Sequence, residues 1–449
     1  MAGDTASTAL RDLLLTTKDG DWGKESPERG FVPYRVIRGT DFPGVRNGDT
    51  SSVPVRYLSE ATVHRRTLEP DDILLETAGG SPGRPTGRSL LITERLLSSL
   101  DLPATCASFA RFLRVDPSKA VPSYIYWHLQ YLYACGQMEE HQVQHTGVAR
   151  FQYTTFAETE QIALPSPEEQ RVIANILGTL DDKIELNRRM NQGLDAMARA
   201  LFKSWFVDFD PVRAKAEGSD PGLPKPLADL FPDSFEDSEL GEIPKGWCPS
   251  SVYGLATYIN GAAYRAFEPN EWRRGLPIIK IAELKAGVTA QTRFSAVDMP
   301  VKYKIDTGDI LFSWSGNPDT SIDIFVWTHG PAWLNQHIFR VVPCSAQERA
   351  YVLMTLRTLR PVFAEIARNK QTTGLGHVTV EDLKRLLAVR PPESVLQGWN
   401  AIIEPVLARS FGLEEEKNTL ATLRDTLLPK LISGELLVRD PSRIVEVSQ

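Results

Sequence analysis

Hydrophobic residues recur at helical spacing along a long stretch near the middle of the chain. The residues at strict seven-residue intervals are Ile173, Leu180, Asn187, Leu194 and Leu201. Such a heptad seam is typical of a helix that pairs with another helix, and its single polar residue would fix the register. The pattern predicts a helix over residues 168–206, about 60 Å long at 1.5 Å per residue. A buried helix of an ordinary helical bundle would explain the same apolar face.

A second stretch repeats this spacing with Leu413, Leu420 and Leu427. Pro405 lies inside the apolar run that precedes them. An interior proline removes one helical hydrogen bond and its ring clashes with the preceding turn. We therefore expect the second helix to kink or break near Glu404.

A segment with short apolar runs typical of strands precedes each long helix, together with one helical run. The strand-like runs are 73–76 and 109–115, then 278–281, 310–314 and 337–342, and the helical runs are 122–135 and 345–367. Short sequences also recur half a chain apart. The matching pairs are Asp72-Ile-Leu-Leu75 with Asp309-Ile-Leu-Phe312, Thr146-Gly-Val148 with Thr373-Gly-Leu375, and, in weakened form, ALPSPEEQ at 163–170 with AVRPPES at 388–394.

This order of segments predicts an α+β protein with an internal, pseudo-twofold repeat. Two globular domains of mixed α/β structure would be separated by two long coiled-coil helices. The expected boundaries are 1–165 for the first globular domain, 166–215 for the central helix, 216–245 for an extended acidic, proline-rich linker, 246–390 for the second globular domain, 391–437 for the distal helix and 438–449 for a tail.

The net charge of −7 would disfavour a DNA-binding protein, but the acidic excess is concentrated in one segment. Residues 216–244 hold one Lys and eight acidic residues, which accounts for the whole imbalance. Residues 245–390 hold 18 Lys and Arg against 12 Asp and Glu. A local basic face matters more for nucleic-acid binding than the total does, so the acidic total does not exclude a DNA-binding protein.

Several classes of protein are disfavoured by what the chain lacks. The four Cys form no Cys-x-x-Cys pair, and no apolar run approaches the ~18 residues of a membrane span. Met1 to Thr17 has no basic region followed by a long apolar one, so we expect a cytoplasmic protein that does not contact the membrane. Phosphate-binding, dinucleotide and nucleophile-elbow glycine motifs are absent, as is the Asn/Asp-Pro-Pro-aromatic motif of an amino-methyltransferase.

Two pairs of polar loops occupy matching places in the repeat. Residues 81–88 match 313–317, and residues 142–150 match 370–374. Arginine, amide and hydroxyl groups can bond to phosphates and base edges, so these loops could contact DNA at two separated half-sites. The candidate DNA contacts are Ser81, Arg84, Arg88, Ser313, Asn317, Lys370, Gln371 and Thr372. Taken singly, each loop could equally be a solvated turn.

The helical segments resemble a known family. Residues 168–191 (EEQRVIANILGTLDDKIELNRRMN) and 200–211 (ALFKSWFVDFDP) closely resemble the central helical region of the specificity subunit of type I restriction-modification systems. Residues 420–435 (LATLRDTLLPKLISGE) resemble its distal helical region, and GDILF at 308–312 and NQHIF at 335–339 resemble motifs of its target-recognition domains. The chain departs from the family pattern at Pro405 and at Ser394 and Val395, where a Glu-Gln pair is expected.

The resemblance implies a non-catalytic subunit, without a cofactor or metal, that reads double-stranded DNA. Its two target-recognition domains would each bind one half of a bipartite target. The two long helices would be antiparallel, set the gap between the half-sites and dock two methyltransferase subunits. Restriction and translocase subunits would join through the complex. Methylation, ATP hydrolysis and cleavage would belong to those partners. The spacer and docking residues would be Ile173, Leu180, Asn187, Leu194, Leu201, Leu413, Leu420 and Leu427.

Two other classes remain open from the residues alone. One is an interaction scaffold of the same architecture that has lost DNA binding. The other is a nuclease, which needs clustered carboxylates to bind Mg²⁺. Acidic and basic residues such as Glu415-Glu-Lys417 lie on a predicted helix, where surface ion pairs explain them better.

Overall fold

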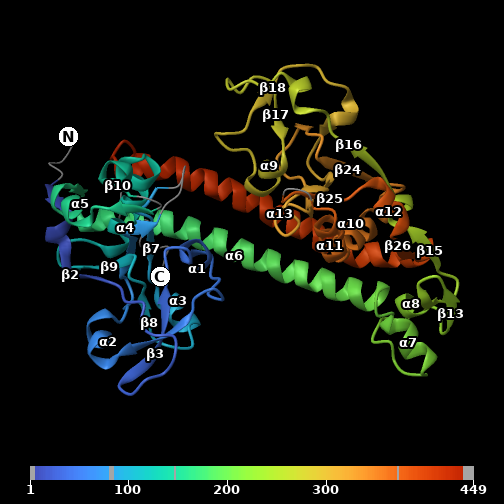
Figure 1. The fold of residues 1–449 in the computed structure, drawn as a ribbon, viewed down its shortest axis with the longest axis horizontal. Helices are drawn as coiled ribbons and strands as arrows, with labels where there is room; N and C mark the ends of the chain where they lie inside the picture. Colours follow the sequence, from blue (N-terminus) through green and yellow to red (C-terminus); the bar gives the residue numbers. More distant parts are fainter. Residues whose placement is uncertain (1–5, 80–84, 146–147, 372–373, 438–449) are drawn as a thin grey trace. The chain divides into compact units, whose positions relative to one another are not determined.

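The computed structural model describes residues 6–79, 85–145, 148–371 and 374–437 (Figure 1). The chain divides into two compact units. Unit 1 consists of residues 1–188 and 416–449, and unit 2 of residues 189–415. Each unit therefore combines a globular segment with part of both long helices. Among the described helices, none combines the length and the apolar character that a membrane crossing requires.

Unit 1 is built around a four-stranded antiparallel sheet in the order β2-β9-β5-β7. Its central strand β5 carries the run Ile73-Leu-Leu75, and all three residues are fully buried. Ile73 and Leu75 pack against helix α4, whereas Leu74 packs against the β3–β8 layer. A strand covered on both faces has no polar side, so its residues do not alternate.

The remaining strands of unit 1 form three smaller sheets, β4-β3-β8 with β3 and β8 parallel, β1-β12 and β10-β11-β6. The strands are β1 (Ala6–Ala9), β2 (Leu14–Asp19), β3 (Phe31–Ile37), β4 (Val55–Ser59), β5 (Ile73–Glu76), β6 (Ala78–Gly79), β7 (Ser89–Leu91), β8 (Ala104–Cys106), β9 (Ala110–Val115), β10 (Gln142–His145), β11 (Val148–Phe151) and β12 (Gln161–Leu164). The helices are α1 (Phe42–Arg46), α2 (Glu60–Arg66), α3 (Glu94–Ser99), α4 (Pro122–Ala134) and α5 (Tyr153–Thr159).

Unit 2 repeats this plan with the sheets β16-β24-β20-β22 and β18-β17-β23-β19, in which β17 and β23 are parallel. The strands are β13 (Phe235–Ser238), β14 (Gly241–Pro244), β15 (Cys248–Ser251), β16 (Ala256–Asn260), β17 (Leu276–Ile279), β18 (Phe294–Ser295), β19 (Lys304–Ile305), β20 (Ile310–Ser313), β21 (Ser315–Gly316), β22 (Asp323–Val326), β23 (Ala332–Leu334), β24 (Ile338–Pro343), β25 (Gly376–His377) and β26 (Leu387–Arg390). The helices are α7 (Asp210–Ala216), α8 (Lys225–Ala228), α9 (Ile281–Ala286), α10 (Arg349–Thr358), α11 (Arg360–Asn369) and α12 (Val380–Arg385).

The predicted internal repeat is confirmed by the turns that precede β5 and β20. The Asp72 carboxylate accepts the backbone N–H three residues earlier at 2.8 Å, and the Asp309 carboxylate does the same at 2.9 Å. The residue before each aspartate has a positive φ, 71° at Asp71 and 96° at Gly308. Aspartate tolerates this left-handed conformation and glycine adopts it readily. The recurring tetrapeptides therefore mark the same turn and strand in both units.

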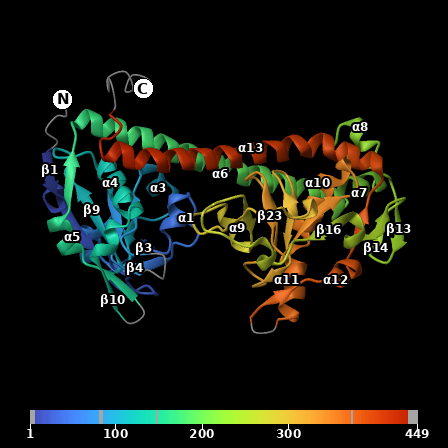
Figure 2. The same cartoon turned by 90° about the horizontal axis from the view of Figure 1, so that it is seen from above.

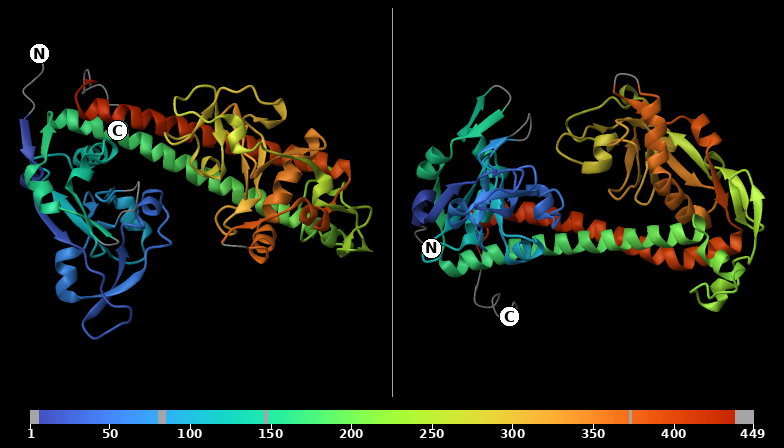
Figure 3. Two further views of the ribbon diagram at one scale, coloured as in Figure 1. Left: turned by 45° about the horizontal axis from the view of Figure 1, so that its top comes forward. Right: turned by 60° about the horizontal axis from the view of Figure 1, so that its bottom comes forward.

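Helix α6 (Pro167–Phe206) confirms the helix predicted from the heptad pattern. Helix α13 (Glu393–Ile432) is also continuous, so the expected break near Glu404 is wrong (Figures 2 and 3). Pro405 lies on the exposed side of α13, between the buried residues Ile403 and Leu407. The hydrogen bond that proline cannot make thus belongs to the solvent side, while apolar packing holds the opposite side in place.

Two other expectations need correction. The segment expected to be an extended linker is folded, with α8 and the β13–β14 hairpin. Phe231 and Trp247 anchor it in the core of unit 2, where they are 2% and 3% exposed. The predicted helical run over 345–367 is two helices, α10 and α11. Pro361 lies in the first turn of α11, where a proline starts a helix well but cannot continue the preceding one.

Candidate nucleic-acid interface

In unit 1, strand pairing brings two of the predicted loops together. β11 pairs with both β10 and β6, and the register places Ala149 opposite Gly79. On the other side of the loop, the backbone N–H and the hydroxyl of Thr86 donate to Gln142 Oε1 at 2.8 and 3.1 Å. Segment 81–88 is thus anchored at both described ends to the β10–β11 hairpin. The candidates Ser81 and Arg84 lie outside the described residues.

Arg88 stands at the inner end of this segment and is directed into unit 1. Its Nε donates to Glu76 Oε2 at 2.8 Å, and its Nη2 donates to the carbonyl oxygen of Gly39 at 2.7 Å. The side chains of Arg88 and Glu76 are 14% and 4% exposed. In this arrangement the guanidinium fixes the base of the loop to β5 and to the segment after β3.

In unit 2, the β21–β25 pairing brings together the corresponding loops, with Gly316 opposite Gly376. Asn317 is exposed, and its Oδ1 accepts the backbone N–H groups of Asp319 and Thr320 at 3.0 and 3.1 Å. Its side-chain NH₂ is the group left to reach a ligand. Ser313, by contrast, is 0% exposed, so it lies behind the loop rather than on its surface.

The second loop of unit 2 is held by an ion pair. Lys370 Nζ donates to both carboxylate oxygens of Asp382 at 2.6 Å. Burial alone would raise the pKa of Asp382, but hydrogen bonds from Lys370 and Thr379 outweigh burial and keep the pKa below its ordinary value. Gln371 is exposed and its amide donates to the carbonyl of Gly374 at 2.8 Å. Thr372 lies outside the described residues.

Two further residues lie in these strand pairings, one in each unit, and were not among the candidates from the sequence. Arg150 lies opposite Ala78 in unit 1, and His377 lies opposite Ser315 in unit 2. Arg150 is exposed and His377 is partly exposed. Both side chains suit hydrogen bonding to a phosphate or a base edge. The internal repeat could have identified this pair, because Arg150 follows Thr-Gly-Val148 by two residues and His377 follows Thr-Gly-Leu375 by two residues.

The seam residues of the helices lie at or near buried positions. Ile173, Asn187 and Leu413 are at most 5% exposed. The partly buried ones are Leu180, Leu194, Leu201, Leu420 and Leu427. The Asn187 amide has no hydrogen-bond partner among the described residues, and an unsatisfied buried amide lowers stability. Such a cost agrees with a residue kept for register, a role that stays a prediction.

Polar contacts join the helices to each other and to the globular segments. In unit 1, Lys183 of α6 and Glu416 of α13 are 3.5 Å apart, and Asp181 binds both Arg46 of α1 and Arg424 of α13. In unit 2, Asp195 of α6 accepts a hydrogen bond from Arg357 of α10 at 3.0 Å. These contacts tie each globular segment directly to the helical spacer.

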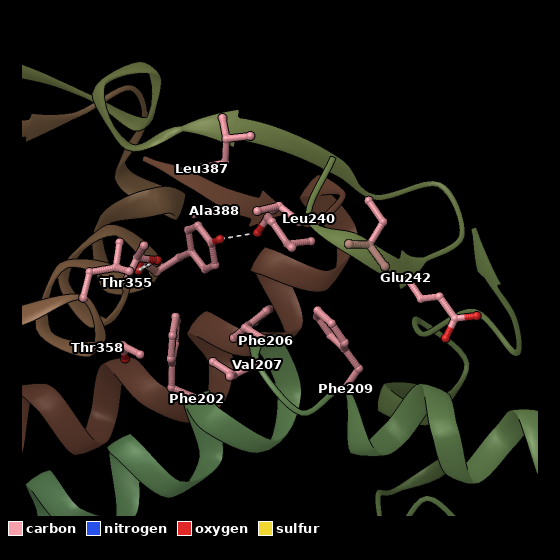
Figure 4. A pocket seen from close by; sticks show the side chains of 14 residues that line it. Phe202, Phe206, Val207, Phe209, Leu240, Glu242, Thr355, Thr358, Leu387 and Ala388 are labelled. Atoms are coloured by element: carbon pink, nitrogen blue, oxygen red, sulfur yellow. Dashed lines mark hydrogen bonds between the residues drawn. The ribbon is translucent and has the colours of Figure 1, made fainter. Parts of the chain in front are cut away.

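The C-terminal end of α6 packs against rings from several elements of unit 2. Phe202, Trp205 and Phe206 all contact Trp399 of α13, with ring centroids 5.1–5.8 Å apart. Beside this cluster, Phe202, Phe206 and Phe209 line an apolar cavity of about 250 Å³ (Figure 4). The hydroxyl of Tyr351, also in its wall, already donates to the carbonyl of Val389. The cavity lacks the convergent free polar groups of a site that binds a polar ligand.

Among the residues that the structure describes, no three His, Cys, Asp or Glu side chains are placed to hold a metal ion. One histidine with a lowered pKa belongs to the core of unit 1. His128 is 5% exposed within α4, and burial lowers its pKa to about 4.

Comparison with known proteins agrees with this architecture. The family model described as the type I restriction modification DNA specificity domain matches residues 39–196. The specificity subunit of the type I restriction enzyme MjaIX from Methanocaldococcus jannaschii is 27% identical over 320 residues, which cover 70% of this chain and 69% of that protein. The specificity subunit of the Haemophilus influenzae enzyme HindI is 25% identical over 332 residues, 64% of this chain and 72% of that protein.

The fold has a counterpart among solved structures. The crystal structure of a type I restriction-modification S subunit from M. genitalium superposes with a TM-score of 0.56 at 14% identity, over 96% of this chain and 97% of that one. Its likeness supports the predicted α+β fold with long helices. The chain is therefore similar in sequence to type I restriction-modification specificity subunits, and its fold is similar to that of one of them.

Proposed function

We propose that the chain is the non-catalytic subunit of a type I restriction-modification complex that recognises a bipartite target in double-stranded DNA. The observation that carries the proposal is the duplicated frame of unit 1 and unit 2. In each unit one short strand pairing, β6 with β11 or β21 with β25, brings two polar loops together. Two copies of one recognition frame in a single chain suit a target with two half-sites.

The domain roles follow from this frame. Residues 1–165 and 246–390 would be the two target-recognition domains, with 166–215 and 391–437 as spacers, 216–245 as the segment between them and 438–449 as a tail. Asn317 and Gln371 are the exposed candidates for base contacts, and the candidates Ser81, Arg84 and Thr372 lie outside the described residues. Arg88 and Lys370 support these loops through the contacts described above, and Ser313 is buried behind its loop.

The methyltransferase subunits would dock on the helical spacer. Met190 and Met197 of α6 are 38% and 44% exposed, and Gly193 between them has open space around its Cα. These three residues share one helix face because they lie at i, i+3 and i+7. Exposed methionines adapt well to a partner surface. Methylation, ATP hydrolysis and cleavage would then be the work of the partner subunits.

The docking surface is tested by the double variant Met190→Glu/Met197→Glu in a co-purification with the methyltransferase subunit. We expect the variant to lose the partner, because two charges would be buried in an apolar contact. Val301→Glu is the control, since Val301 is 79% exposed on another part of unit 2. Retention of the partner by the double variant would place the docking surface elsewhere.

DNA recognition is tested by sequencing the methylome of a host that expresses the chain with and without its methyltransferase subunit. We expect a new N6-methyladenine motif, split by a fixed gap, only when both proteins are present. An intact complex that yields no motif would instead support the scaffold without DNA binding. A continuous motif would contradict the assignment of two half-sites to two frames.

A further inference from the structure

Phe109 is an apolar ring on the surface of unit 1, close to the proposed DNA loops. It lies in the turn between β8 and β9 and is 61% exposed. Folding gains nothing from an exposed phenylalanine, since its favourable contribution comes from removing the ring from water. A single exposed apolar side chain is ordinary on a protein surface, and what distinguishes Phe109 is its place beside the proposed DNA loops.

The backbone around Phe109 is held on both sides. Its carbonyl accepts the N–H groups of Thr77 and Ala78 at 2.9 and 3.3 Å, immediately before the loop that carries Ser81 and Arg84. On the other side, the N–H of Gly20 donates to the carbonyl of Ala110 at 2.9 Å. The approach is so close that a Cβ at Gly20 would lie 2.0 Å from the carbonyl oxygen of Cys106. A rigid turn therefore presents the ring.

His337 occupies the same position in unit 2. Its carbonyl accepts the N–H of Trp314 at 3.4 Å, and the N–H of Gly261 donates to the carbonyl of Ile338 at 3.2 Å. A Cβ at Gly261 would lie 2.2 Å from the carbonyl oxygen of Asn335. In both units the carbonyl of this residue accepts an N–H from the end of the neighbouring strand, and a glycine N–H donates to the carbonyl of the next residue. Phe109 and His337 are therefore equivalent positions of the repeat.

The two rings differ in chemistry and in support. His337 is exposed, its ring centroid lies 5.7 Å from that of Trp314, and the Trp314 indole donates to Asn260 Oδ1 at 3.1 Å. Its Nε2 is 3.1 Å from the amide nitrogen of Gln336. The imidazole of His337 can donate or accept a hydrogen bond at a base edge. The phenyl ring of Phe109 has no polar atom and makes apolar contacts, for which the thymine methyl group is the available partner in the major groove.

We propose that Phe109 and His337 are equivalent specificity-determining residues, each contacting one base pair in a different half-site. Phe109 contacts a thymine methyl group and His337 bonds to a base edge. This inference rests on the proposed DNA recognition and adds two residues and their chemistry to it. It also predicts which half of the target each residue affects.

The test measures binding of the complex of full-length chain and methyltransferase to a panel of duplexes, in which each base pair of either half-site is changed in turn. Phe109→Ala should reduce discrimination at one A·T pair of one half-site by about fourfold, the value of burying a single methyl group. Replacing that thymine by uracil should mimic the variant. His337→Ala should have a comparable effect in the other half-site only, and His337→Gln should retain part of the discrimination.

Matched controls separate base contact from general damage. Leu15→Ala and Val342→Ala remove exposed apolar side chains, 59% and 37% exposed, from β2 and β24. Both should leave all preferences unchanged. The inference is overturned if the wild-type complex discriminates between duplexes but Phe109→Ala and His337→Ala leave its preferences unchanged. It is also overturned if the two variants weaken binding to all duplexes equally or alter the preference in the same half-site. A wild-type complex with no preference would overturn the proposed function itself.

Discussion

Asp181 joins three elements of unit 1, and its replacement by asparagine tests how tightly the first globular segment is tied to the helices. Arg46 of α1 donates to both carboxylate oxygens at 3.1 Å, and Arg424 of α13 donates to the same group. Arg46 also donates to Gln130 Oε1 at 3.0 Å. Burial lowers the pKa of Arg46, but interactions with Tyr126 and Asp181 outweigh burial and keep its pKa above the ordinary value. Asp181→Asn therefore leaves the Arg46 guanidinium without its carboxylate, while Arg424 keeps its second partner Asp425 at 2.8 Å.

The size of the effect follows from exposure. Removing one partner of a fully buried ion pair costs about 3–5 kcal/mol, whereas an exposed pair contributes about 0–1 kcal/mol. The side chains of Arg424, Asp181 and Arg46 are 18%, 23% and 28% exposed. They lie between these limits, and we expect a loss of about 2 kcal/mol in the free energy of local opening.

Native-state hydrogen exchange, read on peptides that cover α1 and the C-terminal end of α13, measures this loss. A loss of about 2 kcal/mol corresponds to roughly thirtyfold faster exchange when opening is at equilibrium. Asp182→Asn is the matched control, because Asp182 is the neighbouring exposed carboxylate, and it should change the opening free energy by less than about 0.5 kcal/mol. Equal effects of the two variants would refute the reasoning. So would strict additivity of Asp181→Asn with Arg46→Gln, since residues in one ion-pair network couple.

Three further variants test other parts of the structure. Glu76→Gln leaves Arg88 charged and only 14% exposed, so the free energy of unfolding should fall by about 3 kcal/mol in urea titrations, and a loss below about 1 kcal/mol would contradict the pairing. Burial lowers the pKa of His128 to about 4, and an unfolded histidine titrates near 6.5. The unfolded chain thus binds the proton first as the pH falls from about 6.5 to about 4, which removes up to about 3 kcal/mol of stability. His128→Phe should flatten the plot of unfolding free energy against pH in this range. An unchanged plot would disprove the burial of a neutral His128. Pro405→Ala should raise the stability by about 1 kcal/mol by restoring a helical hydrogen bond on the solvent side of α13, whereas a destabilised variant would mean that the ring makes contacts that matter.

The sequence predicted those parts of the fold whose signal is local or repeated. The heptad spacing around Leu180 predicted α6, because one face of a helix recurs every 3.5 residues. The repeated tetrapeptides at Asp72 and Asp309 predicted equivalent strands, because a turn aspartate and a buried apolar run leave a recognisable pattern. Composition also pointed to the loops that strand pairing then brought together.

The features that depend on tertiary contacts could not be predicted in this way. Phe109 and His337 share no side-chain chemistry, and only backbone hydrogen bonds reveal that they are equivalent. The sequence of its loop favours Arg88 as a DNA contact, whereas its partner Glu76 ends β5 twelve residues earlier and becomes its neighbour only in the folded chain. The effect of Pro405 depended on which side of α13 faces the core, a property of the packed structure rather than of the local sequence.

The shared frame of the two units has a consequence for how such a protein can diversify. Its turns are held by backbone groups, so residues as different as Thr77 and Trp314, or Phe109 and His337, occupy the same place without disturbing the strands. Mutations at these positions change the exposed chemistry while leaving the hydrogen-bonded backbone intact. Mutations can then change the binding preference of one unit while selection keeps the other unit as it is. A duplicated chain can therefore acquire new preferences more easily than a single recognition domain.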